Sequence, residues 1–147
     1  MLTQNLTVII TRDLQKLKSE LELYQDEANI WKVDKNIANT AGNLCLHLVG
    51  NLNAYIGATL GNTGYVRNRD AEFELKNISR KELIQKIEDT ISMINIVLPG
   101  INEKILKSEY PLLVLKEKTS TEYFLVHLAV HLGYHLGQVN YHRRLLD

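Results

Sequence analysis

Apolar residues recur every three or four positions along four stretches of the 147-residue chain, and this repeat constrains the fold more than any other feature. Such spacing is typical of amphipathic helices, because one helical turn takes about 3.6 residues. The stretches cover approximately residues 3–26, 41–60, 79–98 and 119–145. Each is long enough to bury one face against the others, so we predict an all-α fold built as a four-helix bundle.

Each predicted helix has an apolar stripe that should face the core. The four stripes are Leu6, Ile10, Leu14, Leu17, Leu21 and Tyr24; Leu44, Leu48, Leu52, Tyr55 and Ile56; Ile84, Ile87, Ile91, Ile94 and Leu98; and Leu128, Leu132, Leu136, Val139 and Leu146.

Signals at the helix ends support these limits. Thr40 is a candidate N-cap, and the segments 79–82 and 119–122 both have the spacing of a capping box. The glycines of GNTG at 61–64 are expected to end the second helix. Residues 65–78 lack a helical period and predict an irregular crossover, and residues 101–118 predict a loop with a short helix before YPLLVL.

The composition limits the classes of partner and the cell compartment. Lysine plus arginine and aspartate plus glutamate number 17 each, so a zero net charge gives no general attraction to nucleic acid or anionic lipid. A single cysteine, Cys45, cannot form an internal disulfide, which suits the reducing cytoplasm. We find no signal peptide and no membrane span in the sequence, and we expect a single domain over residues 1–147.

Four of the five histidines lie in the last predicted helix, and His47 lies in the second. Residues four apart on a helix are about 6 Å apart along its axis, so the pair His131 and His135 can share one metal ion. His127 to His135 spans about 12 Å, so a third ligand must come from another helix. We therefore predict a site of His47, His131 and His135 with one open position, as in catalytic zinc sites.

Structural roles remain alternatives for these residues. A histidine pair four apart can simply form the polar edge of a helix. Gly133 and Gly137 indicate either open space or close helix packing, since each glycine costs about 1 kcal/mol inside a helix. We interpret His127 and His142 as surface residues or as residues behind the ligands, and Cys45 as a small core residue.

The segments NLCLHLVGNL at 43–52 and HLGYHLGQ at 131–138 resemble the two motifs of the DinB-like (YfiT-like) metal-dependent four-helix-bundle family. The order of the helices and RNRDAEF at 67–73 extend the resemblance over most of the chain. It implies an up-down-down-up bundle, often a homodimer, whose metal ligands correspond here to His47, His131 and His135. The family often has arginine after the second histidine of its late motif, where this chain has Leu136.

The resemblance implies an enzyme that transfers a low-molecular-weight thiol to a small electrophilic substrate. A divalent ion would lower the pKa of the thiol and hold the thiolate. Zinc or nickel is the expected cofactor, although three imidazoles also suit iron and manganese. A metal-dependent hydrolase is an alternative, disfavoured because no glutamate lies beside either histidine motif. A non-catalytic metal- or ligand-binding stress-response protein is another.

Four polar residues are candidates for contact with an imidazole or with substrate: Asn51, Gln138, Tyr134 and Arg67. Asn51 and Gln138 follow the motif histidines by four and three residues, so their amides can orient an imidazole. Tyr134 can offer a hydroxyl, and Arg67, like Arg69, can bind a carboxylate. Packing or solvation are the alternatives for each, and we favour an ordinary polar helix edge for Asn43.

Overall fold

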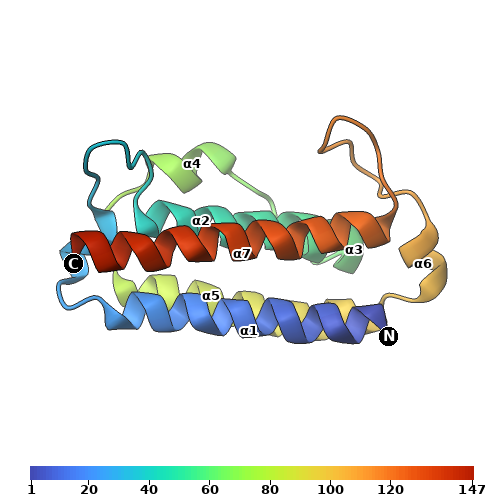
Figure 1. The fold of residues 1–147 in the computed structure, drawn as a ribbon. Helices are drawn as coiled ribbons and strands as arrows, with labels where there is room; N and C mark the ends of the chain where they lie inside the picture. The colour runs from blue at the N-terminus through green and yellow to red at the C-terminus, as the bar shows by residue number, and fades with distance from the viewer.

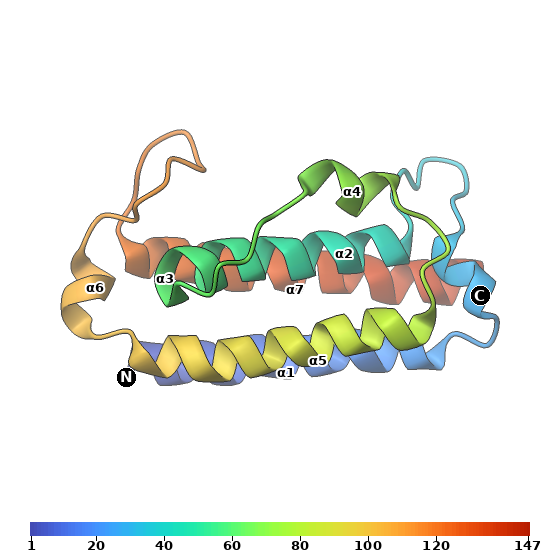
Figure 2. The ribbon, with the colours of Figure 1, turned by 180° about the vertical axis from the view of Figure 1, so that it is seen from behind.

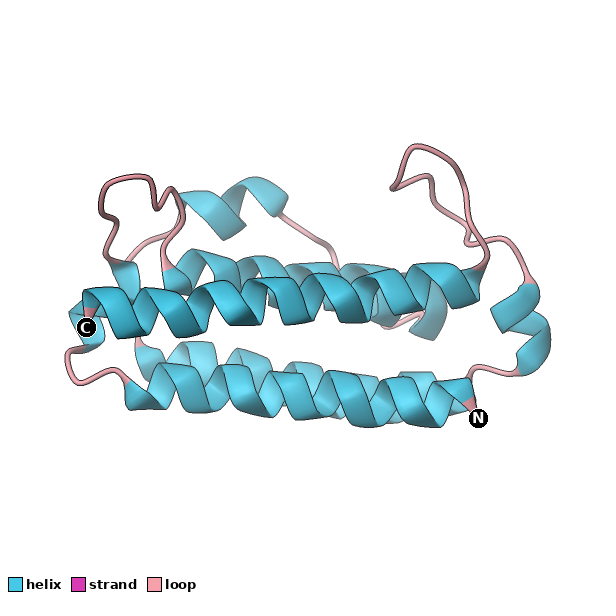
Figure 3. Ribbon diagram, in the orientation of Figure 1, coloured by secondary structure: helices cyan, strands magenta, loops and turns pink.

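Four long helices lie side by side in the computed structural model, which describes residues 1–147 (Figure 1). They are α1 (Leu2–Leu23), α2 (Ala41–Leu52), α5 (Arg80–Val97) and α7 (Thr121–Leu146). Helices α1 and α7 run in one direction, and α2 and α5 run in the opposite direction (Figures 1 and 2). Since the structure contains helices and loops but no strand, the predicted all-α class is confirmed (Figure 3).

Helix α1 buries the whole stripe that its sequence predicts, from Leu6 to Tyr24. It packs against α5 and α7, while α2 packs against the same two helices from the other side. The helix ends at Leu23, before the predicted end near residue 26, because Tyr24 has an extended backbone with ψ of 125°. The buried side chains of all four long helices form one continuous core.

Helix α2 is buried on every side, from Ala41 to Leu52. Helices α5 and α7 cover its inner faces, and the short helix α4 covers the outer one. The predicted N-cap is confirmed, because the Thr40 side chain accepts a hydrogen bond from the backbone N–H of Asn43. A π-helical segment and the single turn α3 (Thr59–Gly61) extend the helix. It ends at Asn62, which takes the left-handed backbone conformation (φ 52°) that we expected a glycine of GNTG to provide.

Helix α4 (Arg69–Glu74) corrects the prediction that residues 65–78 are irregular. The sequence shows no period there because the helix has only six residues, too few for a repeat. Its N-cap is Asn68, whose side chain accepts from the N–H of Ala71. Asn43, interpreted from the sequence as a polar edge, is buried and donates to the backbone oxygens of Glu72 and Leu75. This amide therefore ties α4 to α2.

The buried stripe of α5 differs from the predicted one. Ile87 and Ile94 are buried as expected, but Ile84 and Ile91 are only half-buried, and Leu83 and Val97 are buried instead. Ser79 caps the helix by accepting from the N–H of Glu82, which is one of the two hydrogen bonds of the predicted capping box; the Glu82 side chain does not form the other. The buried residues of α5 differ from the predicted ones because α5 packs against both α1 and α2.

Helix α7 begins one residue later than its predicted capping box implies. The N-cap is Ser120, whose hydroxyl accepts from the N–H of Tyr123. A short helix, α6 (Glu103–Lys107), precedes it, as predicted, and YPLLVL forms a loop. No helix has both the length and the apolar composition that a bilayer crossing requires.

His142 corrects another prediction, since it is buried rather than on the surface and does not lie behind the metal ligands. Its Nδ1 lies 2.6 Å from the hydroxyl of Tyr24, and its Nε2 lies 2.7 Å from the carbonyl oxygen of Lys32. His142 therefore occupies a buried position in α7 where an apolar side chain would be usual. Its hydrogen bond to Tyr24 connects the end of α1 to the end of α7.

Candidate metal centre

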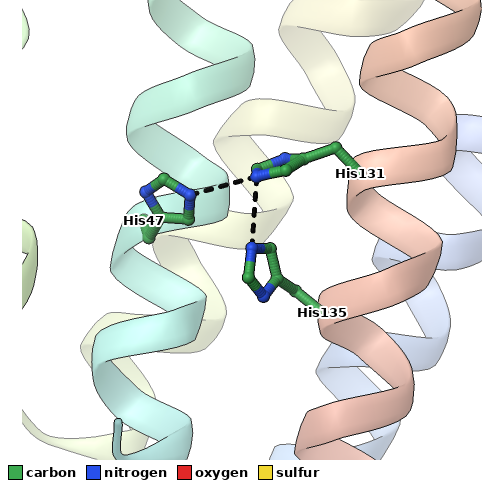
Figure 4. Close-up of side chains that lie close together, drawn as sticks. All are labelled: His47, His131 and His135. Atoms are coloured by element: carbon green, nitrogen blue, oxygen red, sulfur yellow. Dashed lines mark hydrogen bonds between the residues drawn. The ribbon is translucent and has the colours of Figure 1, made fainter. Parts of the chain in front are cut away.

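His47 on α2 faces His131 and His135 on α7 across the space between the two helices (Figure 4). The Nε2 atom of His131 lies 3.2 Å from that of His47 and 3.1 Å from that of His135. Three ligand atoms, one from each ring, lie within 4.8 Å of one another. The fold thus brings together the three histidines that helical spacing selects.

The outer nitrogens of two rings are already engaged. His47 Nδ1 lies 3.1 Å from Oε1 of Glu72, and His135 Nδ1 lies 2.6 Å from Oε1 of Gln138. A carboxylate or amide oxygen only accepts, so each Nδ1 carries the hydrogen and donates it. Both neutral rings then present the lone pair of Nε2 towards His131.

One hydrogen on the His131 ring cannot form hydrogen bonds to both neighbouring histidines. Nε2 of His131 can donate to one of its two neighbours at most, and its buried Nδ1 has no hydrogen-bond partner. If the proton lies on Nδ1, three lone pairs converge with no hydrogen between them. Convergent lone pairs are the arrangement that a metal cation satisfies.

The spacing of the rings also fits a small divalent ion. Nitrogens that bind zinc tetrahedrally, at about 2.0–2.1 Å, lie about 3.3–3.4 Å from one another. Two of the separations, 3.1 and 3.2 Å, are close to that value, and the third pair of nitrogens lies within 4.8 Å. Three neutral imidazoles would leave further coordination positions for a ligand. These residues therefore fit the metal that their sequence spacing predicts.

Burial keeps the imidazoles in the form that binds metal. Desolvation, reinforced by the positive charges that His135 and His47 can carry, lowers the pKa of His131 to about 4. Desolvation also lowers the pKa of His135, against the opposing effect of its hydrogen bond to Gln138. Since neutral imidazole is the ligand form, His131 and His135 need no deprotonation at neutral pH.

Glu72 is the main residue that the sequence reasoning missed. Its carboxylate accepts from His47 and from Arg67, whose Nε and Nη2 lie 2.8 and 2.9 Å from the two oxygens. Burial raises the pKa of Glu72, but the hydrogen bonds from His47 and Arg67 lower it by more, so the pKa stays below its usual value. The buried carboxylate is therefore charged and paired. The only sequence signal for it is its place within RNRDAEF.

Gly50 makes room for this carboxylate. A Cβ atom at Gly50 would lie 1.9 Å from Oε2 of Glu72, far closer than any contact allows. The glycine lies one turn after His47 on α2, so the space it leaves is beside the imidazole that Glu72 holds. Phe73, the next residue on α4, packs against the His47 ring with centroids 5.1 Å apart.

The other candidates from the sequence lie at different places around the three rings. Gln138 touches His135, and Arg67 is bound to Glu72 rather than free for substrate. Asn51 is buried one turn beyond His47 and makes no side-chain hydrogen bond. Tyr134 is 66% exposed on the outer face of α7. Gly133 and Gly137 are explained by open space rather than close packing, because a Cβ would meet nothing nearer than 3.8 Å.

A cavity of about 180 Å³ adjoins the rings of His47 and His131. Its wall is completed by Asn51, Tyr55, Arg67, Arg69, Val114, Phe124, His127 and Leu128. His127, half-buried and outside the group of three, therefore faces this cavity. The cavity gives a small molecule a place beside the convergent nitrogens.

Fold and site together define an all-helical protein with a three-histidine group suited to a divalent metal. The chain belongs to the family described as "Protein of unknown function (DUF1572)", whose model matches residues 6–147. No curated protein matches the chain.

Proposed function

We propose that residues 1–147 form one DinB-like (YfiT-like) domain, a four-helix bundle of the up-down-down-up type that binds a divalent metal. The opposite directions of the α1/α7 and α2/α5 pairs support this arrangement (Figure 1). So do the two histidine motifs, which lie on the facing helices α2 and α7.

His47, His131 and His135 are the proposed ligands, and zinc or nickel is the proposed ion. The single observation that carries this proposal is the convergence of the three Nε2 atoms, with two of the outer nitrogens held by Glu72 and Gln138. Such outer partners fix the tautomer and orientation of a ligating imidazole. The buried Arg67–Glu72 pair would hold the charge of the carboxylate in place beside His47.

The proposed reaction is transfer of a low-molecular-weight thiol to an electrophile. A divalent ion in this site supplies positive charge that lowers the pKa of a thiol and favours the thiolate. The neutral imidazoles leave that charge undiminished, and buried leucines on α2 and α7, Leu48 and Leu132, limit the access of water. The protein would thus orient and activate sulfur without a separate base.

Hydrolysis is less well supported, although a glutamate does lie beside His47. Glu72 contacts Nδ1, on the opposite side of the ring from the convergent Nε2 atoms. Its charge is shared with Arg67, and its lowered pKa makes it a weak base. Glu72 is therefore placed to orient His47 rather than to take a proton from water.

Conjugation of a model electrophile such as monochlorobimane tests the proposed reaction. The rate with several cellular thiols would be compared between metal-loaded protein, metal-stripped protein and stripped protein with zinc or nickel restored. We expect stripping to abolish the enzymatic rate and one of the two metals to restore it. Equal rates with and without metal for every thiol would reject the transferase and favour a non-catalytic binding protein.

A homodimer in the cytoplasm completes the proposal. The cytoplasm is proposed because the single thiol, Cys45, is fully buried in the core, where burial raises its pKa to about 12 and no disulfide forms. The one tryptophan, Trp31, gives no separate reason to expect a dimer, because its ring packs over Gly42 of the same chain and its indole N–H donates to the Ile78 carbonyl. The dimer therefore rests on the family resemblance.

A further inference from the structure

Asn51 is a buried amide without a partner. Its side chain is within the wall of the cavity beside His47 and His131, and the residue is only 7% exposed. The Oδ1 atom is fully covered and accepts no hydrogen bond. The Nδ2 group, which forms no hydrogen bond within the chain, is the part of the amide that can donate to a group in the cavity. Burying an unpaired amide costs stability, so such a group commonly has a role in binding.

The charges around the cavity have one sign. Arg67 and Arg69 are the charged residues in its wall. No acidic side chain lines it. The carboxylate of Glu72, which contacts two residues of the wall, is already bound to Arg67 and His47. An anionic group entering the cavity would therefore meet no negatively charged side chain in its wall.

Arg69 is the arginine that remains free to bind such a group. Arg67 uses Nε and Nη2 on Glu72, and its guanidinium lies over the ring of Tyr55. Arg69 makes no hydrogen bond or ion pair, although it begins α4 next to the cavity. A guanidinium presents parallel N–H donors that match the two oxygens of a carboxylate.

The size of the cavity limits the group that can enter. A volume of about 180 Å³ is small for a ligand-binding cavity, since typical cavities have about 300–1,000 Å³. It suits a small group such as a carboxylate with two or three carbons. Because His47 and His131 form part of the wall, a group in the cavity would lie a few bonds from the sulfur of a thiol bound to a metal ion held by the three nitrogens.

We propose that this cavity is the subsite for a carboxylate carried by the thiol, with the Arg69 guanidinium and the Asn51 Nδ2–H group as its hydrogen-bond donors. The proposal rests on the proposed thiol-binding function and names its substrate class: small thiols with a carboxylate close to the sulfur. Arg67 takes no direct part, since it holds Glu72.

Calorimetric titration of the zinc-loaded protein with matched probes tests the subsite. The probes are 3-mercaptopropionate, the uncharged 3-mercapto-1-propanol, and propionate, which lacks the thiol. We expect the first to bind at least about tenfold more tightly than the second, as one charge-assisted contact allows. Arg69→Gln should remove this preference, while Arg144→Gln, at an exposed arginine beside Tyr141, should keep it.

Asn51→Leu provides a second test that separates binding from folding. The leucine removes an unpaired buried amide of similar size, so thermal stability should hold or rise while affinity for 3-mercaptopropionate falls. Equal affinities for the two thiols in the unmodified protein would overturn the subsite, as would an unchanged preference in Arg69→Gln.

Two further outcomes distinguish this proposal from the thiol function on which it rests. Propionate binding that depends on Arg69, without any binding of 3-mercapto-1-propanol, would support the subsite and reject thiol binding. Binding of 3-mercapto-1-propanol with the same affinity as 3-mercaptopropionate would reject the subsite alone. Absence of binding by all three probes would reject both.

Discussion

At the scale of single residues, the orientation of His47 depends on a side chain that has no sequence motif of its own. Glu72 reaches Nδ1 of His47 only because Gly50 leaves the space that its carboxylate fills. Arg67 holds the same carboxylate from the other side. Metal binding should therefore respond to a substitution at Gly50, which touches none of the three imidazoles.

Gly50→Ala should weaken metal binding by about 10- to 100-fold, the range typical of changes to residues that support a ligating histidine. The added methyl group would displace the end of the Glu72 side chain and leave His47 without its acceptor. Competition with a chromogenic zinc chelator would measure the affinity.

Gly137→Ala is the matched control, because a Cβ at this helical position would meet nothing within 4 Å. It should leave metal affinity unchanged and raise the free energy of unfolding by up to about 1 kcal/mol, the helix-propensity difference between the two residues. An unchanged zinc affinity in Gly50→Ala would show that Glu72 does not support His47.

At the scale of elements, the short helix α4 matters more for the site than its six residues indicate. It carries Glu72, Phe73 and Arg69, and it is fastened to α2 through the buried amide of Asn43. Periodicity identified the four long helices because each repeats its stripe several times. A six-residue helix has no repeat to detect, so its contribution to the site could not be predicted from the pattern.

The ends of α1 and α7 are joined by a histidine that the structure keeps neutral. Burial lowers the pKa of His142 most, although its hydrogen bond to the Lys32 carbonyl raises it, and the Lys32 charge lowers it further. In the neutral form Nε2–H donates to Lys32 and Nδ1 accepts from the Tyr24 hydroxyl. Protonation would place a hydrogen on Nδ1, directly opposite that hydroxyl's own hydrogen.

His142 should make stability fall as the pH drops. Its pKa is about 6.5 in the unfolded chain and lower in the folded one, so below about pH 6.5 the unfolded state binds more protons. Its contribution is complete above about pH 6.5 and decreases as the pH falls towards the lower, folded value. Urea unfolding of metal-stripped protein between pH 7.5 and 5 would measure this dependence.

His142→Gln is the variant that isolates the effect, since glutamine does not titrate. Its stability should depend less on pH than that of the unmodified protein, with a remaining slope from His131 and His135, whose pKa values are also lowered. Identical pH dependence in the two proteins would mean that His142 is not held neutral by the fold.

At the scale of the whole molecule, the outer surface of α7 leaves apolar side chains uncovered. Val130, Tyr134 and Tyr141 are each more than 60% exposed along this helix. The proposed homodimer predicts a mass of twice 16.8 kDa by light scattering at low micromolar concentration. A mass near 16.8 kDa alone would contradict the dimer.

The three-histidine group could be predicted from the sequence because helical geometry alone places His131 beside His135. The choice of His47 followed from the lack of any other histidine outside the last helix. The cavity, the Glu72 support and the burial of His142 depend on how α4, α2, α1 and α7 meet. Such contacts join residues far apart in the chain, and no periodic pattern encodes them.

Metal content tests the central claim most directly. Untagged protein purified without added metal would be analysed for metals, alongside His131→Ala and the neighbouring control His127→Ala, with circular dichroism to verify helicity. We predict one equivalent of a divalent metal per chain in the unmodified protein and in His127→Ala, and its loss from a fully helical His131→Ala. A full equivalent retained by His131→Ala would contradict this prediction.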